Sequence, residues 1–252
     1  MSDLLLLVAA LAAGAINSIA GGGTLLSFPA LVWVGRAPIM ANATNTVALW
    51  PGSLAGMLGF RRELAGAPRW LLLLTIPSLI GGIAGALLLL RTPEKLFAAI
   101  VPWLILAATL LLAAQELIAR RLRLFAQSHE RPTGGRLVFA FAFQFAVGIY
   151  GGYFGAGMGI LMLAALGLIG LSDLHQMNGL KNLLAICING VAAVYFALSG
   201  AVLWRDALLM AAASIVGGFL GARVARRLGR RFVRAAVVTI GLVMTIALFV
   251  RG

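Results

Sequence analysis

The chain has 252 residues, of which 62% are apolar and only 11% are charged. A water-soluble domain of this size needs far more charge on its surface, so the composition excludes one. In a soluble protein the formal net charge of +13 would indicate nucleic-acid binding, but here the arginines lie in short loops between apolar runs. We therefore expect an all-α integral membrane protein that lies in a lipid bilayer and binds no nucleic acid.

Apolar runs follow one another along the whole sequence. A helix needs roughly 20 apolar residues to cross the hydrocarbon layer. The runs of that length without a charge are 4–34, 38–60, 70–90, 96–115, 137–172 and 183–204. Two shorter runs, 207–222 and 235–250, can cross if flanking arginines reach the interface. The first run lacks a basic start and continues past Ala15, so we expect mature structure there and not a cleaved signal peptide.

The two halves of the sequence resemble each other. GGIAGA at 81–86 returns as GGFLGA at 217–222, and the same shift in numbering sets Asn45 beside Lys181. Upstream the shift is slightly smaller, since GAINSIAGGGT from Gly14 aligns with GIYGGYFGAGM from Gly148. Such an internal repeat predicts a duplicated unit. The expected parts are a first membrane repeat at 1–119, a basic cytoplasmic linker at 120–136 and a second membrane repeat at 137–252.

Each half opens with an apolar run, too long for one simple crossing, that glycines interrupt. Either each run is one long tilted helix, giving eight simple spans, or each is a Gly-broken re-entrant or split helix followed by three transmembrane helices. Eight spans place ten basic residues on one side and nine on the other, whereas the second topology places fourteen against five. Because basic loops gather on the cytoplasmic side, we prefer the second topology, an inverted repeat with the linker and the 223–234 loop in the cytoplasm.

Few polar groups interrupt the apolar runs, so each is a candidate for a site. Glycine breaks let backbone N–H groups approach a ligand, and a helix that starts after such a break favours an anion. An amide-rich cluster follows each break, and Lys181, a cation within apolar sequence, marks a site by default. The alternatives are helix packing for the glycines, interhelical hydrogen bonds for the amides and snorkelling for Lys181. The predicted substrate-binding residues are Gly21, Gly22, Gly23, Thr24, Asn42, Thr44, Asn45, Gly155, Gly157, Asn178, Lys181 and Asn182.

Motifs of catalysis and of metal binding are absent from the sequence. It holds no GxSxG, HExxH, Walker sequence or cysteine pair, since Cys187 is the single cysteine. Too few acidic residues lie in the apolar runs for a carboxylate-based cation pump. We expect no enzymatic activity, no cofactor and no metal. A small anionic substrate is favoured, because the polar groups in the apolar runs are amides, hydroxyls, backbone N–H groups and one lysine.

Four stretches of the sequence resemble the TauE/SafE family, also called the sulfite or sulfonate permease family. They are INSIAGGGTLLSFPAL and ANATNTVALWPGSLAG in the first half and GGYFGAGMG and MNGLKNLLA in the second, and the resemblance covers nearly the whole chain. It implies a multi-pass transporter of the bacterial inner membrane. The implied substrates are sulfur-containing anions such as sulfite, sulfoacetate or other organosulfonates, with export by alternating access as the expected direction and mechanism.

Other functions remain open from the residues alone. An anion channel would use the same hydrogen-bond donors without alternating states. The substrate could also be a small carboxylate anion without sulfur. An intramembrane enzyme or assembly subunit is a further alternative, which the lack of a catalytic set disfavours. The sequence is also compatible with a homo-oligomer.

Overall fold

The computed structural model describes residues 2–19, 22–57, 69–127, 134–171, 173–228 and 230–251. Over these ranges the chain is helical between short turns and forms no strand, which confirms the all-α prediction. The helices are α1 (Ser2–Ile19), α2 (Thr24–Trp33), α3 (Pro38–Met57), the 3-10 helix η2 (Arg69–Leu74), α5 (Thr75–Arg91), α6 (Glu94–Gln127), α7 (Gly134–Tyr153), α8 (Met158–Leu168), α9 (Leu174–Leu198), α10 (Trp204–Leu228) and α11 (Arg230–Arg251).

Length and surface both indicate a membrane protein. Within the described residues, the segments Leu71–Arg91, Glu94–Ile118 and Gln176–Leu198 are long and apolar enough to cross a membrane, and shorter apolar helices accompany them. Large apolar side chains lie on the outside; Leu198 and Val250, for example, are each 82% exposed. Such a surface is unfavourable in water and is expected where hydrocarbon surrounds the protein.

Each long opening run is broken into two helices at its glycines. In the first half α1 ends at Ile19 and α2 begins at Thr24; in the second half α7 ends at Tyr153 and α8 begins at Met158. The backbone φ angles are 122° at Gly22, 77° at Gly155 and 75° at Gly157. Only glycine adopts such angles without strain, so these residues redirect the chain. The single long helix that eight simple spans require is therefore not formed in either half.

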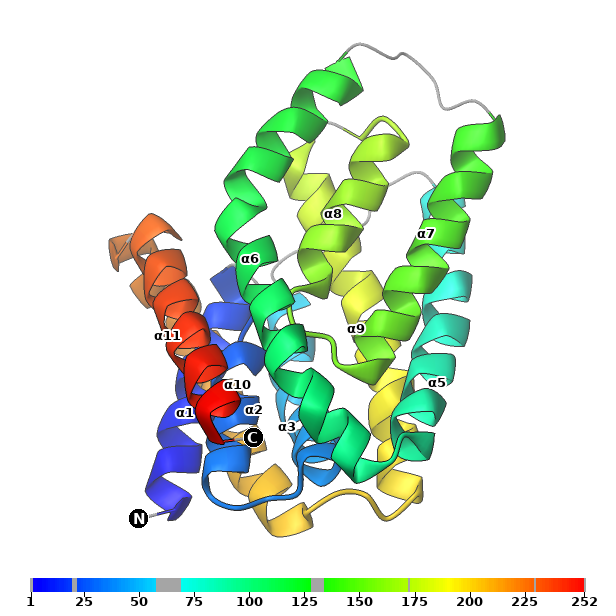
Figure 1. Cartoon of the computed structure of the whole chain (residues 1–252). Coiled ribbons are helices and arrows are strands. Elements are labelled where there is room, and N and C mark those ends of the chain that lie inside the picture. Colours follow the sequence, from blue (N-terminus) through cyan, green and yellow to red (C-terminus); the bar gives the residue numbers. More distant parts are fainter. Residues whose placement is uncertain are drawn as a thin grey trace.

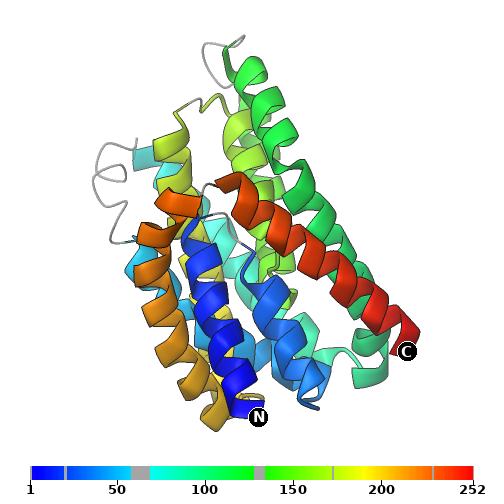
Figure 2. The ribbon, with the colours of Figure 1, turned by 90° about the vertical axis from the view of Figure 1, so that its left-hand side faces the viewer.

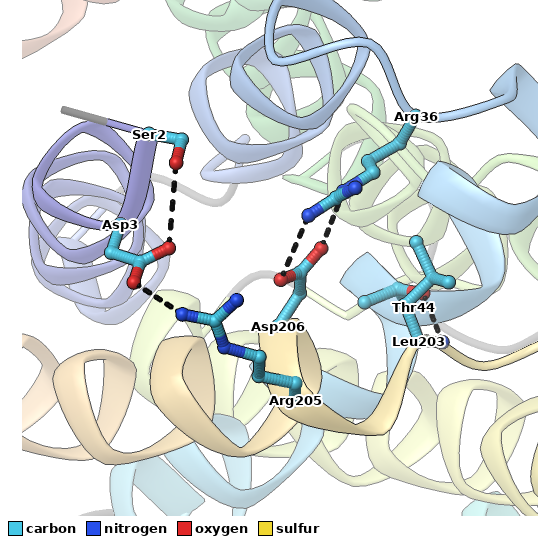
Figure 3. Close-up of polar contacts among 7 residues, drawn as sticks. All are labelled: Ser2, Asp3, Arg36, Thr44, Leu203, Arg205 and Asp206. Atoms are coloured by element: carbon cyan, nitrogen blue, oxygen red, sulfur yellow. Dashed lines mark hydrogen bonds and ion pairs between the residues drawn. The ribbon is translucent and has the colours of Figure 1, made fainter.

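The first two helices form a hairpin that returns to the end of the molecule where the chain starts. Asp3, at the start of α1, accepts a hydrogen bond from Arg205 at 2.7 Å, and Arg36, just after α2, pairs with Asp206 at 2.7 Å (Figure 3). Because Arg205 and Asp206 are neighbours on α10, α1 begins and α2 ends at the same place, here named the terminal end. In Figure 1, α7 starts and α8 ends at the opposite end.

Helices from different halves pack most closely. Figure 2 shows α1 lying along α10, and Figure 1 shows α5 along α7. Glycines make both contacts possible, because a Cβ on Gly217 would collide with the Leu11 carbonyl and a Cβ on Gly81 would lie 2.5 Å from the Phe145 carbonyl oxygen. These two glycines are therefore packing residues of the helix contacts. Helices α3 and α9, again one from each half, also pack against each other.

Helix boundaries follow the two alignments found in the sequence. The alignment of Gly14 with Gly148 also sets the start of α2, Thr24, on the start of α8, Met158. The alignment of Asn45 with Lys181 sets the start of α3 on that of α9, and the start of α6 on that of α11. The α1–α10 contact has its counterpart in α7–α5.

The expected linker 120–136 is helical at both ends. Helix α6 continues to Gln127 and α7 begins at Gly134, so each membrane helix extends into the segment that the sequence assigns to the linker. Residues 128–133 lie outside the described ranges.

Candidate functional site

A cavity of about 100 Å³ lies where the two helix breaks meet the facing sides of α3 and α9. On this measure one water needs roughly 10–15 Å³, so the space suits a few waters or one small ion. Among the residues predicted from sequence, those that line the cavity are Gly22, Thr24, Asn45, Gly155, Gly157, Lys181 and Asn182.

Two short helices begin at the cavity wall. Thr24 is the first residue of α2 and Met158 the first of α8, and both line the cavity. Several first-turn N–H groups already donate to carbonyls of the preceding break, as Leu25 does to Gly22 and Met158 to Gly155. The dipole of each helix still places about half a positive charge at its start. Two helix starts facing one small space make that space favourable for an anion.

Lys181 adds a full positive charge to the same wall. The side chain is 9% exposed, so it is largely removed from water. Its stem lies against the first turn of α8, because a Cβ on Gly159 would be 3.1 Å from Lys181 Cδ. Among the described residues that line the cavity, none is an aspartate or glutamate. The described side chains of the cavity wall therefore carry one positive charge and no negative charge.

The facing sides of α3 and α9 contribute corresponding positions. Four wall positions of α3 have an aligned partner on the wall of α9. Under the alignment of Asn45 with Lys181 the pairs are 45 with 181, 46 with 182, 49 with 185 and 53 with 189. Positions four apart lie on one face of a helix. Asn45, 2% exposed, has a buried Oδ1 with no hydrogen-bond partner within the described part of the chain. A buried amide oxygen without a donor costs free energy, and the same holds for Asn42 Oδ1 and Gln144 Oε1, which do not line the cavity.

The first helix break is organised by a side chain. Asn17 Oδ1 accepts the N–H of Gly22 at 3.2 Å and that of Gly23 at 2.8 Å. These two N–H groups are thus already bonded, which differs from the expectation that they hold an anion. Gly23 does not reach the cavity wall but packs on α1, where a Cβ would collide with the Ala13 carbonyl.

Three further predicted residues lie away from the cavity wall. Asn42 Nδ2 donates to the Tyr153 carbonyl at 2.9 Å, at the end of α7. Thr44 Oγ1 accepts the Leu203 N–H at 3.0 Å, which joins α3 to the loop before α10 (Figure 3). Asn178 also lies off the wall. Gly21 lies outside the described residues.

Some wall residues are missing from the set that the sequence predicts. The set predicted from the sequence lacks Asn17, Thr46, Ser53, Gly159 and Asn189, which all line the cavity. The repeat could have identified two of these residues, since it aligns Thr46 with the predicted Asn182 and Ser53 with Asn189. Within the described residues, no three histidine, cysteine or acidic side chains gather as metal ligands would.

The chain is similar to a family of membrane transporters over almost its whole length. The family described as Sulfite exporter TauE/SafE matches residues 6–248. A probable membrane transporter protein of Haemophilus influenzae is 31% identical over 231 residues, covering 91% of this chain and 88% of the relative. The probable membrane transporter protein YfcA of Escherichia coli K12 is 32% identical over 242 residues, covering 94% of this chain and 85% of the relative.

Proposed function

The chain belongs to the sulfite exporter TauE/SafE family of membrane transporters, and from this premise we propose that it carries small sulfur-containing anions across the bacterial inner membrane. Sulfite, sulfoacetate and other organosulfonates are the proposed substrates. The matched family and relatives are named for transport, which agrees with a protein that has no enzymatic role.

One observation supports the anion most directly. Two helix starts and the buried Lys181 line the same cavity, and no carboxylate is among its described lining residues. A small oxyanion in this cavity would be attracted by the ammonium group and by the two helix dipoles. It would also accept hydrogen bonds from amide side chains on the wall.

The size of the cavity favours a compact substrate. About 100 Å³ leaves room for a sulfite-sized ion or for the charged group of a sulfonate, and little more. A sulfonate with a longer organic part would extend from the cavity between the helices. We therefore rank sulfite and short sulfonates above larger anions.

The inverted repeat is proposed as the basis of alternating access. Two observations support it. Helices start at corresponding positions when the two sequence halves are aligned, and the contact of α1 with α10 corresponds to the contact of α7 with α5. In this arrangement the hairpins α1–α2 and α7–α8 are re-entrant, each entering from one side and meeting the other near the middle. Substrates of such transporters bind at the interface between repeats, near the bilayer midplane.

Transport measurements on the purified protein test this function. Proteoliposomes loaded with sulfite should show saturable flux and accelerated exchange when sulfite is present on both sides. Flux that rises linearly with concentration and shows no exchange would instead indicate a channel. Preference for acetate over sulfite at equal concentration would indicate a carboxylate transporter. No flux of any of these anions, from vesicles with correctly folded protein, would contradict the proposal.

A further inference from the structure

Asn17 has a fixed orientation at the edge of the cavity. The residue lies near the end of α1, lines the cavity, and accepts two backbone N–H groups, from Gly22 and Gly23, through one side-chain atom. Only the carbonyl oxygen of an amide can accept an N–H, so the orientation of this amide is determined by its partners. With Oδ1 turned to the backbone, Nδ2 is the polar atom of Asn17 left for the cavity.

We propose that Asn17 donates a hydrogen bond from Nδ2 directly to an oxygen of the transported anion. The two backbone N–H groups are taken up by Oδ1, and the NH₂ group of the same amide is the donor that Asn17 offers to the anion. Asn17 is then a specificity-determining residue of the first half, and this inference rests on the proposed function. Gly22 and Gly23 position Asn17 and do not bind the anion themselves.

The second half supplies different donors. The alignment of Gly14 with Gly148 places Gly151 at the position corresponding to Asn17, so no side chain caps the second break in this way. There the wall consists of Gly155 and Gly157, the start of α8 and the Lys181 side chain. An anion between the halves thus meets an amide on one side and an ammonium group with a helix start on the other. Donors on both sides suit an oxyanion, whose oxygens point in several directions, better than a halide.

A purely structural role for Asn17 is the competing explanation. In that case its amide only holds the Gly22–Gly23 turn before α2, and any side chain that accepts the same two N–H groups would serve equally well. Aspartate is such a side chain, and a carboxylate is favourable at a helix N-terminus. Asn17→Asp therefore keeps the acceptor while it replaces the NH₂ donor by a negatively charged oxygen.

Three proteins separate the two roles: the parent, Asn17→Asp and Asn17→Ala. We expect Asn17→Ala to lower the thermal midpoint in detergent, since both the cap and the donor are lost, and Asn17→Asp to retain the parent midpoint. Titration with sodium sulfite at constant ionic strength should show about a tenfold weaker Kd for Asn17→Ala and at least about a hundredfold weaker Kd for Asn17→Asp, which loses the bond and repels the anion.

The outcomes are distinguishable. Parent-like stability with strongly weakened sulfite binding in Asn17→Asp supports a direct donor. Sulfite binding by Asn17→Asp that equals the parent overturns the donor role and leaves the proposed function intact. A lowered midpoint for Asn17→Asp overturns the capping geometry on which the proposal rests. If the folded parent binds neither sulfite nor sulfoacetate, the proposed function fails and the role of Asn17 fails with it.

Discussion

Two neighbouring ion pairs at the terminal end differ in their contact with water. Asp206 is 4% exposed in its side chain and is held by Arg36, whose Nε and Nη2 both donate to it. The Asp3–Arg205 pair has side chains that are 44% and 78% exposed. Charges that water can reach lose little when a partner is removed, whereas a buried carboxylate depends on its partner.

Arg36→Ala should therefore destabilise the protein far more than Asp3→Ala. Breaking a fully buried pair costs roughly 3–5 kcal/mol, and because Arg36 is partly exposed we expect about 2 kcal/mol. For Asp3→Ala we expect less than about 1 kcal/mol. Thermal midpoints of the two variants in the same detergent provide the measurement. Equal shifts would show that burial of Asp206 does not control the strength of its pair.

Lys181 is the residue whose charge most affects the proposed site. Lys181→Ala should weaken sulfite binding by about ten- to a hundredfold, since charge-assisted hydrogen bonds contribute roughly 1.5–3 kcal/mol. Lys181→Arg should rescue only partly, because a planar guanidinium needs a different geometry. Titration of the purified variants with sulfite is the measurement. An unchanged Kd for Lys181→Ala, with lower expression, would mean that Lys181 only anchors its helix.

At the scale of elements, glycines decide how closely the helices approach. Adjacent glycines on α10 occupy different surroundings: a Cβ on Gly217 would collide with the Leu11 carbonyl of α1, whereas a Cβ on Gly218 would lie 3.5 Å from its nearest neighbour, the Gly52 carbonyl oxygen. The first position is closed to any side chain and the second accepts a methyl group in ordinary contact. Without a hydrophobic effect between helices in lipid, such backbone contact is a main source of association.

Alanine substitutions at these two positions form a matched pair. Gly217→Ala should push α1 away from α10 and cost about 1–3 kcal/mol, as overpacking does. Gly218→Ala should be neutral or stabilise by up to about 1 kcal/mol, because alanine has less backbone freedom to lose and favours a helix. Unfolding of both variants in mixed detergent gives the comparison. A Gly217→Ala variant as stable as the parent would show that the α1–α10 contact relaxes without cost.

For the whole molecule, the two sequence halves do not form separate packing units. The opening helix of each half packs on a helix of the other half, and the buried core joins α1, α6 and α10 through residues such as Leu6, Ile105 and Met210. A half expressed alone would leave these faces without their partners.

Residues 1–127 and 134–252, produced as separate chains, should therefore be degraded or aggregate when expressed singly. Expressed together they should associate, because the faces that each lacks are supplied by the other. Co-purification through a tag on one chain tests this. A monodisperse first half on its own would contradict the interdependence of the halves.

Orientation in the membrane can be tested at the two ends of the bundle. In a Cys187→Ala background, Gly134→Cys lies at the exposed start of α7 and Ser199→Cys lies at the exposed turn after α9. The charge distribution predicts that Gly134→Cys faces the cytoplasm and Ser199→Cys the periplasm. An impermeant thiol reagent added to intact cells should label only Ser199→Cys. Labelling of Gly134→Cys from outside would refute the inverted-repeat topology.

The sequence by itself determined the membrane environment, the position of the helix breaks and part of the candidate site. Apolar length, charge placement and repeated glycine clusters are local properties, and each has a direct physical consequence for a helix in hydrocarbon. They identified Lys181, Asn45 and the glycines at 155 and 157, all of which line one cavity.

Tertiary structure alone decided which polar groups face that cavity. Asn42 and Asn45 lie in the same cluster of the sequence, yet Asn42 donates to the Tyr153 carbonyl while Asn45 reaches the wall. Asn17 is absent from the predicted set because its side chain accepts the N–H groups of Gly22 and Gly23 only after the chain has turned back. A side chain's function as donor, cap or packing residue depends on the direction in which it points, and in a bundle of interleaved halves that direction is set by helices distant in the sequence.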